Sequence, residues 1–115
     1  MGTFLLSLRR PFVADHFHDL PGFVEERHGH NWEAEATFLG GDGAETGLTQ
    51  ALDAWVERMD YSLLNNQETL AGRNPTAELL AQDLFLFLEG AGHGVTRVKV
   101  REKANYWASC SRVAR

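Results

Sequence analysis

The chain has 115 residues, of which 43% are hydrophobic and 23% are charged, as in a globular protein rather than a disordered segment. Its length predicts a single domain over residues 1–115. No apolar run could span a bilayer, no secretory signal is evident, and the one cysteine, Cys110, cannot form an internal disulfide, so we expect a cytoplasmic protein without a membrane partner. The net charge of −5 argues against nucleic acid as a partner.

Two strands are predicted in the first third of the chain. Apolar and polar residues alternate over Thr3–Asp15 and again over Asn31–Leu39, which is the period of a half-buried strand. The segment between them, His18–Arg27, contains Pro21 and Gly22 and is predicted to be a loop.

Two helices are predicted next. Gly40–Gly47 is rich in glycine and should form a turn. Apolar residues then recur at helical spacing over Leu48–Met59, with Thr49 as the N-cap. Asp60–Arg73 is polar and irregular in pattern. A second helix is predicted to begin at Asn74–Pro75, with the asparagine as its cap and the proline in its first position.

Two further strands, Val95–Arg101 and Asn105–Val113, complete the pattern. The order β-β-α-α-β-β predicts an α+β domain, a four-stranded antiparallel sheet with two helices on one face. Phe85 and Phe87 widen the apolar stripe of the second helix beyond one face, which favours an oligomer that covers them.

A group of histidines suggests a metal site. His28 and His30 are two residues apart at the start of the second strand, so their side chains project from one face and can reach one ion. His16 and His18 both lie where the first strand ends, and spacing alone leaves either of them as the third ligand. Three neutral imidazoles suit zinc and leave a position open for substrate or water.

Several segments occur in the order of a known set of motifs: Phe12–His16, His28–Asn31, Thr46–Leu48, Asp60–Asn65, Asn74–Glu78 and Val98–Glu102. Together they resemble the motifs of the 6-pyruvoyl-tetrahydropterin synthase family. That family includes the 6-carboxy-tetrahydropterin synthases of deazaguanine (queuosine) biosynthesis. The match covers nearly the whole chain, and its Asn-Pro-Thr-x-Glu helix start is unchanged.

The resemblance implies a ligand set, a substrate site and an assembly. It selects His16, with His28 and His30, as the zinc ligands. It implies that Glu102 anchors the ring of a pterin-like substrate and that Thr76 belongs to the substrate site. Members of the family form a barrel from the sheets of three subunits (the tunnelling fold), often with two stacked rings and with active sites between subunits. We therefore expect a homotrimer or a homohexamer.

The catalytic positions depart from the family pattern. Val24 stands where the family has a cysteine, four residues before the first histidine of His-Gly-His. Glu25 follows it, and in some relatives a glutamate replaces that cysteine or comes directly after it. Tyr61 stands where the family has the histidine of its Asp-His pair, whereas Asp60 is kept. The resemblance thus implies Glu25, Asp60 and Tyr61 as the candidate proton-transfer residues.

The expected activity follows from this resemblance. It implies a zinc-dependent lyase acting on 7,8-dihydroneopterin triphosphate or a related dihydropterin. The alternative is a zinc-containing protein that binds a pterin-like or purine-like ligand, or acts on an altered substrate, without the parent reaction. The replaced cysteine and histidine motivate that alternative.

Overall fold

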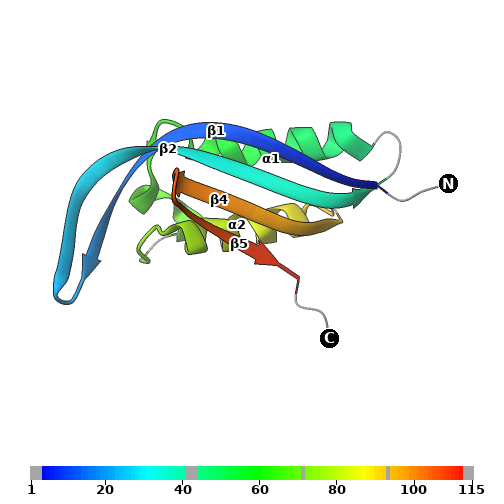
Figure 1. Cartoon of the computed structure of the whole chain (residues 1–115). Coiled ribbons are helices and arrows are strands. Elements are labelled where there is room, and N and C mark those ends of the chain that lie inside the picture. Colours follow the sequence, from blue (N-terminus) through cyan, green and yellow to red (C-terminus); the bar gives the residue numbers. More distant parts are fainter. Residues whose placement is uncertain (1–3, 41–43, 71, 93, 113–115) are drawn as a thin grey trace.

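The computed structural model describes residues 4–40, 44–70, 72–92 and 94–112 (Figure 1). Two long strands, β1 (Phe4–Leu20) and β2 (Phe23–Gly40), are followed by helix α1 (Ala44–Met59) and a two-residue strand β3 (Ser62–Leu63). Two short 3₁₀ turns, η1 (Leu64–Asn66) and η2 (Glu68–Leu70), lead to helix α2 (Ala77–Gly90). Strands β4 (Val95–Lys103) and β5 (Tyr106–Ser111) end the fold.

The sheet has five strands in the order β3-β1-β2-β4-β5. Its four long strands are antiparallel as predicted, but β3 runs parallel to β1. The prediction of four strands is therefore wrong by one, and β3 comes from the segment predicted to be irregular. The cause is a pair of hydrogen bonds to Val13, whose N–H donates to Asp60 Oδ1 and whose carbonyl accepts from the Tyr61 N–H. They fasten this polar segment to the edge of β1.

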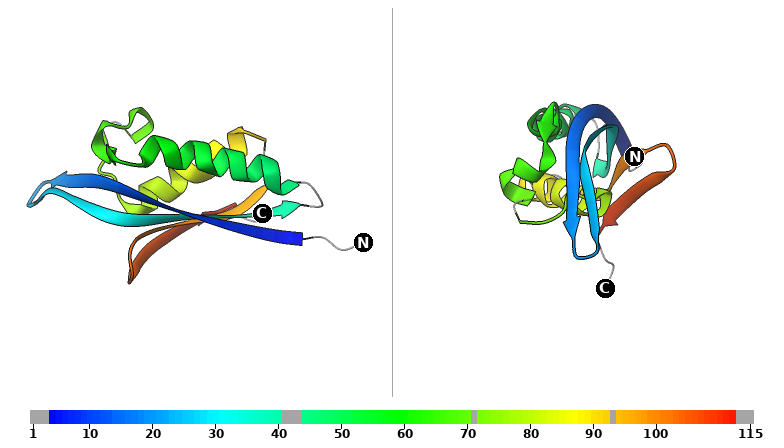
Figure 2. Two further views of the ribbon diagram at one scale, coloured as in Figure 1. Left: turned by 90° about the horizontal axis from the view of Figure 1, so that it is seen from above. Right: turned by 90° about the vertical axis from the view of Figure 1, so that its left-hand side faces the viewer.

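The hairpin of β1 and β2 is the longest feature of the molecule, and its closed end extends past the helices (Figures 1 and 2). The loop predicted at residues 18–27 is wrong, because His18 pairs with Glu25 and Leu20 with Phe23. Only Pro21 and Gly22 turn the chain, and Gly22 has φ 78°. Proline followed by a residue of positive φ is the order of a type II turn, so two residues are enough.

Both helices begin elsewhere than predicted. Helix α1 starts at Ala44, so Thr49 lies inside it and is not its cap; residues 41–43 of the predicted turn lie outside the described residues. Helix α2 starts at Ala77 with Thr76 as its N-cap, since the Thr76 hydroxyl accepts from the Leu79 N–H at 3.1 Å. Asn74 instead accepts the N–H of Asp19 at 2.8 Å.

The helices cover one face of the sheet, and the core lies between these two layers (Figure 2). Trp32 of β2, Trp55 of α1 and Leu84 of α2 are each fully buried there. Phe85 is only 6% exposed in the same core, and Phe87 packs against it beneath the Arg58 guanidinium. The single chain therefore buries Phe85 and covers part of Phe87, and the expected oligomer stays a prediction. No helix in the described ranges is long and apolar enough to cross a membrane.

Candidate metal centre

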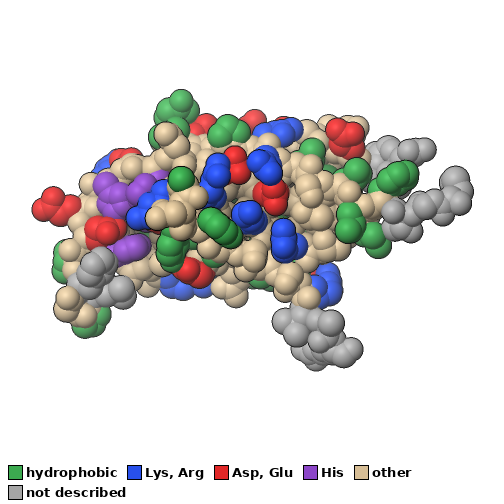
Figure 3. Space-filling model, in the orientation of Figure 1, with side chains coloured by type: hydrophobic (Ala, Val, Ile, Leu, Met, Phe, Trp, Pro, Cys, Tyr) green, Lys and Arg blue, Asp and Glu red, His purple; other side chains and the backbone are tan. Residues whose placement is uncertain are grey.

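Three histidines meet on the helix-facing side of the hairpin. His16 lies directly opposite His28 in the register of β1 and β2, and Ala14 lies opposite His30. One ring nitrogen from each of His16, His28 and His30 falls within 4.8 Å of the others. The structure thus brings together the trio that the resemblance selects. Histidine side chains gather over this end of the molecule in the space-filling view, with acidic and basic groups beside them (Figure 3).

Backbone carbonyls fix the proton on two of these rings. His16 Nδ1 donates to the Pro75 carbonyl at 2.8 Å, and His28 Nδ1 donates to the Glu26 carbonyl at 2.8 Å. A carbonyl oxygen only accepts, so in each neutral ring Nε2 carries the lone pair. These two Nε2 atoms are 3.1 Å apart, and two lone pairs cannot hydrogen-bond to each other. A cation between them resolves this conflict.

The third ring adds an independent sign of a missing ligand. His30 Nε2 is buried and has no hydrogen-bond partner within the described part of the chain. A buried polar atom left in this way is costly unless something binds it. The residues present therefore fit a metal ion with a preference for imidazole nitrogen, and zinc has that preference.

Burial keeps these rings in the form that binds metals. His16 is 0% exposed, and loss of solvation lowers its pKa, although the Pro75 carbonyl and the Glu102 carboxylate oppose the shift. Burial also lowers the pKa of His30, again against the opposing charge of Glu102. Lowered pKa values leave both imidazoles neutral at neutral pH, as metal coordination requires.

Two carboxylates flank the histidines. Glu102, near the end of β4, lies with its two oxygens 3.7 Å from His16 Nε2 and 3.9 Å from His30 Nε2. Its side chain is only 12% exposed. Glu25, on β2, lies with Oε1 3.3 Å from His28 Nε2 and 3.6 Å from His18 Nδ1, and it is 37% exposed. Each carboxylate can therefore act on a molecule bound at the metal position.

A β-bulge brings Glu25 to this face. From the His16–His28 pair to the His18–Glu25 pair, β1 advances by two residues and β2 by three. Simple alternation would place Glu25 on the face opposite His28, but one extra residue in a strand reverses the faces beyond it. His18 lies beside Glu25 and also beside His16, with the His16 and His18 ring centroids 5.0 Å apart. Glu25, His16 and His18 form a second group of donor atoms within 4.8 Å, and His16 belongs to both groups.

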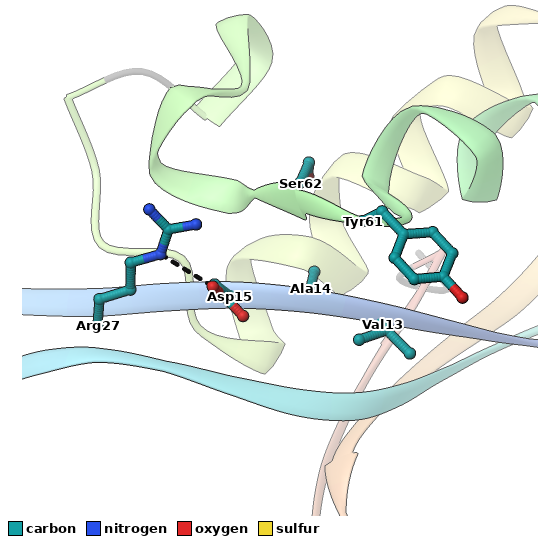
Figure 4. Close-up of a pocket in the computed structure, with 6 residues that line it drawn as sticks. All are labelled: Val13, Ala14, Asp15, Arg27, Tyr61 and Ser62. Atoms are coloured by element: carbon teal, nitrogen blue, oxygen red, sulfur yellow. Dashed lines mark hydrogen bonds and ion pairs between the residues drawn. The ribbon is translucent and has the colours of Figure 1, made fainter.

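Asp60 and Tyr61 lie elsewhere. Val13 and Asp15 alternate along β1 with the inward Ala14 and His16, so they project from the opposite face of the sheet. The Tyr61 ring stands beside Val13 at a pocket where Arg27 pairs with Asp15 (Figure 4). Tyr61 is 85% exposed and has φ 53°. No hydrogen bond or ion pair among the described residues joins Asp60 or Tyr61 to the three histidines.

Sequence reasoning singled out Asn65, Asn74 and Pro75 as parts of motifs but missed the contacts by which they hold the hairpin in place. Asn65 accepts the Phe17 N–H and donates to the Phe17 carbonyl, and Asn74 accepts the Asp19 N–H. The Pro75 carbonyl, which orients His16, belongs to the same group. These contacts join positions 48 to 59 residues apart. No local sequence pattern can predict contacts at that separation. Thr76, predicted for the substrate site, follows Pro75 directly and caps α2.

A curved sheet with helices on one face and a cluster of three histidines defines an α+β protein with a candidate metal centre. Comparison with known proteins gives its family: the model of the 6-pyruvoyl tetrahydropterin synthase family matches residues 6–113. The chain is 31% identical over 104 residues to an Archaeoglobus fulgidus protein provisionally named 6-carboxy-5,6,7,8-tetrahydropterin synthase, over 83% of this chain and 86% of that one. This chain therefore belongs to the 6-pyruvoyl tetrahydropterin synthase family.

Solved structures share the fold. The 6-pyruvoyl tetrahydropterin synthase of Caenorhabditis elegans matches with a TM-score of 0.83 at 15% identity, over 98% of each chain. A Plasmodium vivax 6-pyruvoyltetrahydropterin synthase matches with a TM-score of 0.71 at 15% identity, over 97% of this chain and 99% of that one. That structure is of a variant in which a catalytic glutamate is replaced by cysteine.

Proposed function

We propose that this chain is a zinc-dependent lyase that acts on 7,8-dihydroneopterin triphosphate or a related dihydropterin. The observation that carries the proposal is the convergence of three imidazoles, two with Nδ1 protons donated to backbone carbonyls and one with a buried Nε2 that has no hydrogen-bond partner among the described residues. In a chain of this family, such a set would hold a catalytic zinc. The bound zinc would act as a Lewis acid that makes the substrate's side-chain hydroxyls more acidic.

The two carboxylates take different roles in this proposal. Glu25 is the general base, because it is half-exposed, lies beside His28 and can be reached by a substrate at the metal position. A glutamate is also named as catalytic in the Plasmodium vivax protein. Glu102 is mostly buried and accepts hydrogen bonds from the ring N–H and amino groups of the pterin, an arrangement that a carboxylate suits. Thr76 borders the same site.

Asp60 and Tyr61 complete the site of a neighbouring subunit. Within one chain they lie at the edge of β1 beside Val13, no hydrogen bond or ion pair among the described residues joins them to the histidines, and Tyr61 is 85% exposed. We therefore propose a homotrimer, or a homohexamer of two trimers, in which each site combines the histidines of one subunit with the Tyr61 of the next.

Product analysis tests the reaction. The zinc-loaded protein is incubated with 7,8-dihydroneopterin triphosphate, and the products are identified by mass spectrometry. Loss of triphosphate or release of side-chain carbons supports a lyase and tells the two parent reactions apart. With zinc in excess, Glu25→Gln should lower turnover by about 10²- to 10⁴-fold, the usual effect of losing one proton-transfer group.

A second candidate function is ligand binding without turnover. Val24 is 75% exposed and offers no nucleophile or proton, and Tyr61 replaces a histidine of the family pattern. A protein that binds a dihydropterin at the zinc centre but converts none of the family's substrates, with Glu25→Gln indistinguishable from wild type, would favour this candidate over the lyase.

A further inference from the structure

Glu25 lies beside the nitrogen donors of the histidine centre. Its Oε1 is 3.3 Å from His28 Nε2, while the two ligand nitrogens of His16 and His28 are 3.1 Å apart. A tetrahedral zinc ion at about 2.0–2.1 Å from nitrogen and oxygen ligands separates neighbouring donor atoms by about 3.3 Å. The carboxylate oxygen therefore stands at the distance from His28 that two ligands of one ion have.

The other carboxylate fits that position less well. The oxygens of Glu102 are 3.7 Å and 3.9 Å from the nearest histidine nitrogens, and each oxygen faces a different ring. Glu102 also falls outside both groups of donor atoms that lie within 4.8 Å of one another, whereas Glu25 belongs to the second group, with His16 and His18. Of the two, Glu25 is the better candidate for coordination.

Charge favours the same arrangement. Imidazoles that coordinate a metal are neutral, so they leave both charges of a divalent cation uncompensated, and in a partly buried site opposite charge close by stabilises the cation. Glu102 supplies one negative charge at slightly longer range, and Glu25 supplies the second next to His28. The bulge in β2 creates this contact, since regular alternation would turn Glu25 away from the histidines.

We propose that Glu25 is a fourth protein ligand of the metal in the substrate-free protein. This inference rests on the zinc centre of the proposed function. It adds to that proposal the coordination of the metal before substrate binds. Glu25 closes the position that the three histidines leave open, so that a substrate has to displace it. Only after leaving this position can Glu25 act as the base.

Metal binding in the absence of substrate tests the assignment. Metal-free protein is titrated with Co²⁺, whose visible absorption reports coordination number and ligand type, and Zn²⁺ affinity is measured by competition with a chromophoric chelator. Glu25→Gln should weaken Zn²⁺ binding by at least about tenfold, the lower end of what even indirect partners of metal ligands contribute, and should change the Co²⁺ spectrum.

Two variants serve as matched controls. Glu26→Gln removes the same charge from an exposed neighbouring side chain and should leave both the affinity and the spectrum at wild-type values. Glu102→Gln should weaken binding less than Glu25→Gln and keep the wild-type Co²⁺ spectrum. Circular dichroism of the metal-free variants checks that each one folds.

The outcomes separate this inference from the proposed function. A wild-type Co²⁺ spectrum and affinity in Glu25→Gln, or a spectral change in Glu102→Gln alone, would overturn the assignment of Glu25 while leaving a three-histidine zinc site in place. Unchanged metal binding in the double variant His28→Ala, His30→Ala would instead contradict the zinc centre itself.

Discussion

At the scale of single residues, the chemistry of the centre depends on which nitrogen of each ring carries the proton. The Pro75 and Glu26 carbonyls hold the protons of His16 and His28 on Nδ1 and so aim both Nε2 lone pairs at one point. Such outer contacts orient metal ligands and fix their tautomer. Pro75 is well suited to this role, because it is buried and its carbonyl lies next to the cap of α2.

The lowered pKa values predict how stability depends on pH. Burial lowers the pKa of His16 and His30, so as pH falls below about 6.5 the unfolded chain takes up protons that the folded chain resists. The free energy of unfolding of the metal-free protein should therefore fall as pH decreases from about 7 to 5, by at most about 1.4 kcal/mol per pH unit for each histidine. Urea unfolding at a series of pH values measures this, and His30→Gln should reduce the slope. A free energy of unfolding that does not change between pH 7 and pH 5 would contradict the burial of His16 and His30 as neutral rings.

Glu102 provides a prediction about substrate affinity. As the proposed ring anchor, it would make charge-assisted hydrogen bonds worth about 1.5–3 kcal/mol, so Glu102→Ala should weaken dihydropterin binding by about 10- to 150-fold. Calorimetry on the zinc-loaded protein measures the affinity. Glu89→Gln, an exposed carboxylate on α2 that pairs with Arg112, serves as the control. Unchanged affinity in Glu102→Ala would remove Glu102 from the pterin site.

At the scale of elements, alternation along the strands predicted the sheet, its antiparallel pairing and the common face of His28 and His30. The sequence did not show that Pro21–Gly22 alone turns the chain, because polar residues at 18–27 look the same in a loop and in an exposed hairpin. The bulge that turns Glu25 toward the histidines could not be predicted from the sequence either, because it depends on the register between β1 and β2. The choice between His16 and His18 needed the motif resemblance, and the structure places His16 with the other two ligands.

The start of helix α2 links fold and site, which gives a prediction about stability. Thr76→Ala removes the side chain that accepts the Leu79 N–H, and losing such a cap costs about 1 kcal/mol. We expect Tm of the metal-free protein to fall by several degrees in thermal unfolding, and Thr76→Ser to restore it. If Thr76→Ala and wild type melted together, the cap would contribute nothing to stability.

At the scale of the whole molecule, the described part of the chain is 54 Å in its longest dimension, with the histidines on the helix-facing side of the hairpin and Tyr61 exposed beside Val13 at the edge of β1. Within one chain Phe85 is buried and Phe87 is partly buried against the core between sheet and helices. We therefore expect the proposed assembly to serve the site more than the core. Tyr61 keeps a positive φ at an exposed position, a strained conformation that is common where a side chain has a functional task.

Mixing two inactive variants tests whether the site is shared between subunits. Glu25→Gln removes the proposed base of one subunit, and Tyr61→Phe removes the hydroxyl that the next subunit would supply. If the interface is head-to-tail, each site takes Glu25 from one chain and Tyr61 from its neighbour. In oligomers formed at random from an equal mixture of the two variants, about a quarter of the sites then contain both intact groups. Activity should therefore rise to about a quarter of the wild-type value when the two variants are unfolded and refolded together. Sedimentation of the mixture should show trimers or hexamers. A monomer at micromolar concentration, or a mixture no more active than the variants apart, would contradict the shared site.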